Sequence, residues 1–170
     1  KRFDPFSRSD DHIIETLFYN TNGEKILVGD NSNCLREIDM TLNCDFKAVM
    51  SCHSTMTDFA VDTLRDNIVT VGREGVVRKW DKDAQAVLQQ HNLERELSCV
   101  AYTQCDEQVA VGFSKDENRS SSEKNDVSFV ILCGNNLSNI IHHGRNSQKT
   151  LIVCKFSNDG KLVAFGSKDS

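Results

Sequence analysis

The sequence is poor in proline and has no long apolar run. Its single proline, Pro5, lies near the amino end, and no stretch approaches the roughly 18 apolar residues that a membrane-spanning helix requires. No apolar region of the kind found in signal peptides follows the first residues. We therefore expect no membrane association. The first residue is Lys1 rather than Met, which predicts that the sequence begins inside a longer chain.

An excess of basic residues is missing as well. Lys and Arg number 20 and Asp and Glu number 25, which gives a formal net charge of -5. Domains that bind nucleic acids usually carry the opposite balance, with Lys and Arg clustered on one face. The charge therefore argues against a nucleic-acid partner.

Cysteine pairs with metal-binding or redox spacing are also absent. The seven cysteines are odd in number and irregularly spaced, and none forms a Cys-x-x-Cys pair. This favours a cytoplasmic protein whose thiols serve as small buried apolar side chains. The seven are Cys34, Cys44, Cys52, Cys99, Cys105, Cys133 and Cys154.

Signals for catalysis or for a cofactor are weak. His142 and His143 are adjacent, and neighbouring side chains on a strand point to opposite faces, so the two make a poor metal site. Cys52 and His53 are adjacent too, and nothing around them supplies an oxyanion site. No phosphate-binding glycine loop, Gly-x-Ser-x-Gly or His-Glu-x-x-His motif occurs. We expect no enzyme, cofactor, metal or small-molecule substrate.

What the sequence does contain is a series of short apolar runs separated by turn residues. They are rich in Val, Ile, Leu, Phe and Thr, and none shows helical spacing over a long segment. So many short strands in one chain predict an all-β fold. The expected strands are 13–19, 25–28, 34–38, 59–64, 67–71, 76–80, 86–89, 98–103, 108–111, 127–132, 138–141, 151–156 and 161–165.

Four segments of equal length repeat the order strand, polar turn, strand and glycine. They are residues 19–29, 62–72, 102–112 and 156–166, which end at Gly29, Gly72, Gly112 and Gly166. The intervals between the first three of these glycines are close to 40 residues. The interval from Gly112 to Gly166 is longer because of the insertion 114–126. A period of about 40 to 45 residues with four strands per unit is typical of a propeller blade. Histidines are expected before each first strand, at His12, His53, His91 and His142–His143.

The second repeat ends in Trp80-Asp81, and with this dipeptide the chain resembles the WD40 family over nearly its whole length. Gly72 lies eight residues before Trp80, and this spacing, like the segment 162–169, is similar to the echinoderm microtubule-associated protein-like (EMAP-like) group. The resemblance implies a WD40-type β-propeller with antiparallel four-stranded blades. The chain would hold about three and a half blades of an incomplete propeller, with approximate repeats 10–51, 52–90, 91–141 and 142–170.

The resemblance also implies a hydrogen-bonded tetrad in the second repeat, formed by His53, Thr70, Glu74 and Trp80. Glu74 stands where the family usually has Asp, and its longer side chain changes the geometry. The first and third repeats lack the Trp and are expected to use apolar packing instead. The positions expected to line one face of the strands are Ile26, Val28, Ile68, Thr70, Val109, Val111, Leu162 and Ala164.

Basic residues are the candidates for partner binding, and two interpretations remain open for them. The insertion 114–126 has no apolar side chain, so it is either a solvated loop or a loop that contacts a partner or is phosphorylated at residues 120–122. The cations of the second repeat belong either to a solvated blade edge or to a docking patch for an acidic partner. The candidates are Arg73, Arg78, Lys79, Arg119, Lys124 and Lys168.

The function expected from these features is a non-enzymatic scaffold that binds proteins. The resemblance implies a microtubule-associated protein of the EMAP-like group, with tubulin as the partner and a cytoplasmic, cytoskeleton-associated location. The alternative is a generic WD40 adaptor subunit of another assembly, such as a ubiquitin ligase or a trafficking or ribosome-assembly complex. A propeller enzyme is the third class, and no residue pattern supports it.

Overall fold

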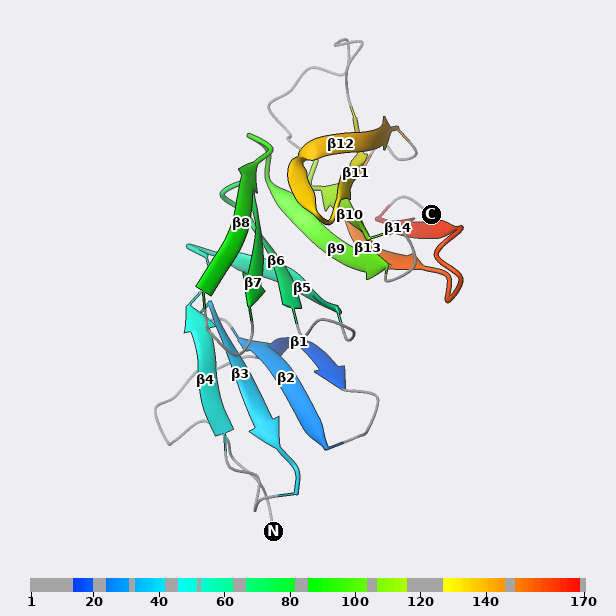
Figure 1. The fold of residues 1–170 in the computed structure, drawn as a ribbon. Coiled ribbons are helices and arrows are strands. Elements are labelled where there is room, and N and C mark those ends of the chain that lie inside the picture. Colours follow the sequence, from blue (N-terminus) through cyan, green and yellow to red (C-terminus); the bar gives the residue numbers. More distant parts are fainter. Residues whose placement is uncertain are drawn as a thin grey trace.

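The computed structural model describes residues 14–19, 24–30, 33–41, 46–51, 53–62, 67–81, 86–103, 107–115, 127–145 and 149–168. All regular secondary structure in these residues is β-strand (Figure 1). The strands of sheet 1 are β1 (Ile14–Tyr19), β2 (Lys25–Asp30), β3 (Cys34–Asp39) and β4 (Phe46–Ser51). Those of sheet 2 are β5 (Met56–Asp62), β6 (Asn67–Gly72), β7 (Val76–Asp81) and β8 (Ala86–Asn92). Those of sheet 3 are β9 (Leu97–Thr103), β10 (Gln108–Phe113), β11 (Phe129–Cys133) and β12 (Asn136–Gly144), and sheet 4 contains β13 (Leu151–Phe156) and β14 (Val163–Ser167).

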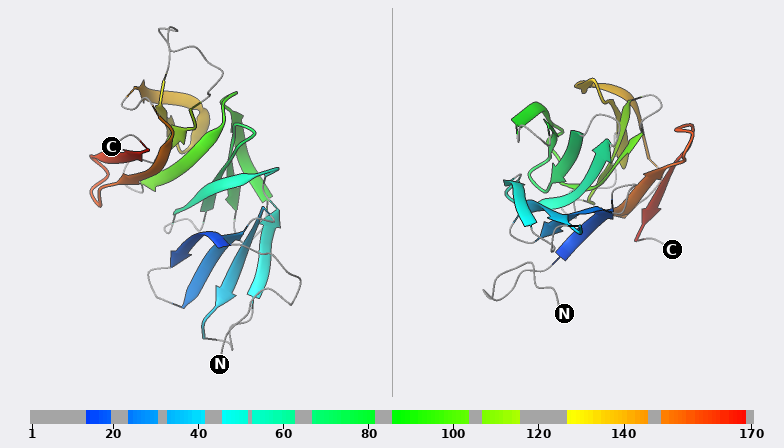
Figure 2. Two further views of the ribbon diagram at one scale, coloured as in Figure 1. Left: turned by 180° about the vertical axis from the view of Figure 1, so that it is seen from behind. Right: turned by 60° about the horizontal axis from the view of Figure 1, so that its bottom comes forward.

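Each sheet is an antiparallel meander in which every strand pairs with the next one in the chain. The sheets follow one another in chain order, from the blue and cyan sheet to the orange and red pair (Figures 1 and 2). The first strand of each sheet contacts the first strand of the next, so β1, β5, β9 and β13 form one series. This arrangement is consistent with a β-propeller-like fold.

The expectation of an all-β chain is confirmed, and each of the expected strands overlaps an observed one. Strand β4 is an additional strand that the sequence analysis did not predict. Its six residues, Phe46–Ser51, include Val49 as the only β-branched side chain, so its strand signal is weak. The expected repeats contain one sheet each, although β8 and β12 continue slightly past the expected boundaries.

A β-bulge lies at the start of the first strand in each of the four sheets. In each sheet the pairing of the first two strands skips one residue close to this point. Aligned on this bulge, Gly29, Gly112 and Gly166 occupy the same position, but Val71 and not Gly72 occupies it in sheet 2. The alignment of Gly72 with the other three glycines was therefore wrong by one residue. The skipped intervals are Ile14/Thr16, Met56/Asp58, Leu97/Cys99 and Leu151/Val153.

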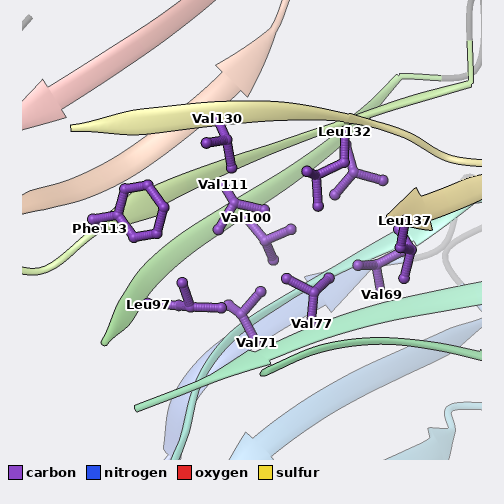
Figure 3. Close-up of a cluster of buried hydrophobic side chains, with 11 residues drawn as sticks. Val69, Val71, Val77, Leu97, Val100, Val111, Phe113, Val130, Leu132 and Leu137 are labelled. Atoms are coloured by element: carbon purple, nitrogen blue, oxygen red, sulfur yellow. The ribbon is translucent and has the colours of Figure 1, made fainter. Parts of the chain in front are cut away.

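The core lies between consecutive sheets. Figure 3 shows the largest cluster, in which Val69, Val71 and Val77 of sheet 2 face Val111 and Leu132 of sheet 3. Because apolar surface is covered from both sides, each sheet depends on its neighbour to exclude water. Smaller clusters join sheet 1 to sheet 2 and sheet 3 to sheet 4.

The predicted inward face is correct for three repeats and wrong for the fourth. All the residues predicted for this face in sheets 1 to 3 are buried, namely Ile26, Val28, Ile68, Thr70, Val109 and Val111. In sheet 4, however, Leu162 is 72% exposed and Ala164 is exposed as well. Val163 and Phe165 pack against sheet 3 instead. A shift by one residue exchanges the two faces of a strand, which explains the error.

Polar side chains reach between neighbouring sheets. Asn33 Nδ2 donates to Ser54 O at 2.8 Å, and Met56 N donates to Asn33 Oδ1 at 2.8 Å, which joins sheet 1 to sheet 2. Asp58 Oδ2 accepts the backbone N–H of Val100 in β9 at 2.9 Å. These bonds satisfy backbone groups at the sheet boundaries and fix how the first strands lie together.

The histidines expected before the first strands do not share one position. His53 precedes β5 as expected. His91 lies in β8 opposite Val77, and His142 and His143 lie in β12. The expectation was wrong for these three because the outer strands are longer than the sequence pattern indicated. His12 lies outside the described residues.

Candidate functional site

A chain of hydrogen bonds connects four side chains of sheet 2. The indole Nε1–H of Trp80 in β7 donates to Oγ1 of Thr70 in β6 at 2.8 Å. Thr70 Oγ1 lies 2.7 Å from Nε2 of His53, just ahead of β5. The other ring nitrogen, Nδ1, is hydrogen-bonded to Oε1 of Glu74 in the turn between β6 and β7. The structure thus brings together the four residues expected to form a tetrad.

One arrangement of protons satisfies the bonds among Trp80, Thr70, His53 and Glu74. Indole nitrogen can only donate, so the Thr70 hydroxyl accepts a hydrogen bond from Trp80 and donates one to His53 Nε2. His53 Nδ1 then carries the ring proton and donates it to Glu74. The other tautomer would place two acceptors, Nδ1 and Oε1, against each other. The bond to Glu74 thus favours the tautomer with the proton on Nδ1, and the lowered pKa of His53 favours the neutral ring.

Gly72 makes room for the longer side chain of Glu74. A Cβ added at position 72 would collide with Glu74 Oε2 and lie only 2.6 Å from His53 Nδ1. Any side chain there would push the carboxylate away from the imidazole. The glycine at position 72 therefore gives the carboxylate of Glu74, which is longer than the usual Asp, the space that it needs.

Arg78 closes the carboxylate end of the network. Its Nη1 lies 3.1 Å from Glu74 Oε1 and 2.7 Å from His53 Nδ1. With the ring proton on Nδ1, Glu74 is the partner in this network that the guanidinium can bind. Arg78 is half-buried, so this candidate for partner binding already has an internal role.

The network shifts the pKa values of its two ionisable members downward. Burial lowers the pKa of His53 below 6.5, and it outweighs the opposing hydrogen bond and charge of Glu74. Burial alone would raise the pKa of Glu74. The hydrogen bonds from His53 and Arg78 act the other way and hold that pKa below 4.5.

We expect the chain to lose stability when the pH falls from about 7 to about 5. Because the pKa of folded His53 lies below 6.5, the unfolded chain binds this proton first. The stabilisation by neutral His53 is complete above that value and is lost as the pH decreases. Urea unfolding at both pH values measures the change. The variant His53→Gln should lose less over the same range, and an equal loss would contradict the assignment.

Apolar residues take the place of the tetrad in the neighbouring sheets. Trp80 pairs with Ile68, and the corresponding pairs are Ile38 with Ile26 in sheet 1 and Leu132 with Val109 in sheet 3. Ile38 and Leu132 are both buried. The expectation that the first and third repeats rely on apolar packing agrees with this.

Lys79 is buried, which corrects its assignment to a docking patch. Only 5% of the residue is exposed, and its Nζ donates to Gly134 O of sheet 3 at 2.9 Å. The ammonium also lies 6.0 Å from the centre of the Tyr102 ring. Strand alternation turns Lys79 toward sheet 3, while Trp80 faces sheet 1. Lys79 therefore links sheet 2 to sheet 3, and its side chain is not exposed for binding to a partner.

Four candidates for partner binding remain, of which two are exposed and two lie outside the described residues. Arg73 follows β6, is exposed and pairs with Glu96 at 3.3 Å. Lys168 follows β14 and is exposed. Arg119 and Lys124 lie outside the described residues. Strands β10 and β11 flank their segment, as expected for the insertion.

The described residues offer no cluster of side chains for a metal ion. No group of three or more His, Cys, Asp or Glu side chains there could hold a metal ion. His142 and His143 are both exposed on β12, and Cys52 lies outside the described part of the chain. No helix in that part is long and apolar enough to cross a membrane.

Cys99 of β9 and Cys154 of β13 form a buried thiol contact between sheets 3 and 4. The Cys154 thiol donates to Ala110 O at 3.7 Å. Its contact with Cys99, together with burial, raises the pKa of Cys154. These two thiols serve as small core side chains, as expected, and Cys34 and Cys133 are only partly buried.

Two residues near Lys168 were not singled out from the sequence. Lys115 N donates to Thr150 Oγ1 at 3.0 Å, and Lys168 N donates to Thr150 O at 3.2 Å. Both lysines are therefore placed around one threonine that precedes β13. The sequence could have indicated Lys115, because this residue follows shortly after an expected strand. Only the topology shows that the end of β10 lies next to Thr150.

Searches of protein-family models and of curated proteins found no match to this chain.

Proposed function

We propose that this chain is a non-enzymatic protein-binding module with a WD40-type propeller architecture. The observation that carries the proposal is the network of Trp80, Thr70, His53 and Glu74 inside one of four consecutive antiparallel sheets. It joins a loop, a strand, a turn and a second strand, so it rigidifies a unit that presents loops at both ends. A rigid scaffold with variable loops is suited to recognising proteins.

The chemistry of the network favours a structural role over a catalytic one. Trp80, Thr70 and His53 are buried, and each polar atom in the chain of hydrogen bonds already has a partner. A general base needs access to a substrate proton at hydrogen-bonding distance. His53 uses Nε2 for Thr70 and Nδ1 for Glu74, which leaves neither ring nitrogen for a substrate.

The more specific part of the proposal is a cytoplasmic, microtubule-associated protein of the EMAP-like group. Its support is the resemblance of the segment around Gly72 and Trp80. Tubulin is an acidic partner, and exposed basic residues such as Arg73 and Lys168 suit such a surface. Protein, rather than nucleic acid, is the partner that agrees with a net charge of -5.

Co-sedimentation with microtubules tests this assignment. We expect the chain to appear in the pellet in amounts that saturate as the microtubule concentration rises. The same centrifugation without microtubules controls for aggregation. A chain that stays in the supernatant at every microtubule concentration would overturn the microtubule assignment and favour an adaptor role in another assembly.

A further inference from the structure

Charge is separated between the two ends of sheets 2 to 4. The end at which β6, β10 and β14 finish is called the basic end here. Its described cations are Arg73, Arg95, Lys115, Arg145, Lys149 and Lys168. Its described carboxylates are Glu74, Glu94 and Glu96. The opposite end has the reverse balance, with Asp62, Asp81, Glu107 and Asp159 against Lys161.

Three exposed cations of the basic end are connected across the sheets by a path of contacts. Arg73 Nε contacts Glu96 Oε1 at 3.3 Å, and the carbonyl of Glu96 accepts the N–H of Ser114 at 2.9 Å. The next residue, Lys115, is bonded to Thr150, which also accepts the N–H of Lys168. We call Arg73, Lys115 and Lys168 the cationic row. It connects sheet 2 through sheet 3 to sheet 4.

The cations of this row are available to a ligand. Lys115 and Lys168 are exposed, and neither forms an ion pair with another described residue. The side chain of Arg73 is 65% exposed despite its contact with Glu96. The carboxylate of Glu74, the residue after Arg73, is half-buried and is engaged by His53 and Arg78. The local positive charge is thus only partly neutralised within the described molecule.

We propose that the cationic row binds an extended, acidic polypeptide segment rich in Asp and Glu. This rests on the proposed protein-binding function and adds the chemistry of the partner and the end that takes it. An extended segment presents carboxylates at intervals of about 6 to 7 Å on one side, which allows successive contacts along a row. Charge complementarity of this kind sets orientation and accelerates association.

The same surface fits nucleic acid less well. Single-stranded nucleic acids are held by aromatic side chains that stack on bases. The large exposed apolar side chains among the described residues are all Leu, Ile, Val or Met, so they provide no aromatic platform. The acidic opposite end would also repel a long polyphosphate chain. A short acidic peptide avoids that repulsion because it covers one end alone.

Fluorescence anisotropy with a labelled oligoglutamate tests the proposal on the full 170-residue chain. A peptide of about ten residues spans about 33 Å when extended, which is long enough to cross several strands. We expect saturable binding at low salt. The affinity should fall as the ionic strength rises from about 0.01 M to about 1 M, because the Debye length shortens from about 30 Å to about 3 Å.

Charge reversal locates the site. The double variant Lys115→Glu/Lys168→Glu should raise Kd about tenfold or more, because two attractive contacts become repulsive. The matched control is Lys155→Glu/Lys161→Glu, which changes the net charge equally at exposed positions of sheet 4 outside the basic end. The control should bind like the original chain. A thermal melt of each variant shows that both remain folded.

Three outcomes would overturn the proposal. These are no binding by the original chain, equal losses in both double variants, and tighter binding of a labelled oligouridylate than of the oligoglutamate. The peptide assay contains no microtubules, so it separates the two proposals. Microtubule pelleting without peptide binding would remove only this inference, and peptide binding without pelleting would remove only the microtubule assignment.

Discussion

The substitution Trp80→Ala is expected to lower the free energy of unfolding by about 3–5 kcal/mol, the usual cost of emptying a large aromatic site. Trp80 is only 7% exposed and packs with residues of sheets 1 and 2, including Leu35 and Ile68. Its removal also takes away the donor to Thr70 Oγ1. Because the side chain spans an interface between sheets, the surroundings cannot close the cavity without moving one sheet against the other.

Urea unfolding followed by circular dichroism measures this effect. The control Trp80→Phe keeps an aromatic ring in the cluster but lacks the indole N–H, so it should cost less than the alanine variant. An alanine variant as stable as the original chain would contradict the burial of Trp80 and the packing of sheet 2 on sheet 1.

The substitution Thr70→Val is expected to cost about 2–6 kcal/mol, although valine has nearly the same shape as threonine. The Thr70 hydroxyl accepts from Trp80 and donates to His53, at 2.8 and 2.7 Å. Valine would leave both partners buried without a hydrogen bond, and each loss costs about 1–3 kcal/mol. Repacking cannot compensate, because Trp80 is held in β7 and His53 is held by its bond to Glu74.

Tryptophan fluorescence reports this change directly, since Trp80 is the only tryptophan in the sequence. Urea unfolding monitored by its emission gives the free energy for each variant. Thr70→Ser keeps the hydroxyl and loses only a methyl group, so it should cost about 1 kcal/mol. If serine and valine cost the same, the hydroxyl would have no part in the stability of the network.

The architecture was readable from the sequence because its signals are local. Short Val- and Ile-rich runs bounded by turn residues predicted every described strand except β4. Trp80 and His53 were recognisable because the dipeptide Trp80-Asp81 and the spacing to Gly72 are distinctive. The network itself was predicted only from the resemblance, which pointed to His53, Thr70, Glu74 and Trp80.

The features that the sequence did not predict depend on the register of the strands and on contacts between sheets. Gly72 looked equivalent to Gly112, but the bulge at the start of β5 places it one residue further along its strand. A single step of this kind exchanges the faces of a strand. Lys79 looked like a surface cation, but it is buried against sheet 3, where the carbonyl of Gly134 accepts a hydrogen bond from it.

The buried contacts between described sheets run from each sheet to its neighbours in the chain. In such a row, the free energy of folding is close to a sum of one term for each sheet and one for each interface. Unfolding need not then be a single event. The interface of sheets 1 and 2 can open while the valine cluster between sheets 2 and 3 remains closed. Trp80 emission would report the first of these events, and amide hydrogen exchange in β9 and β10 would report the second.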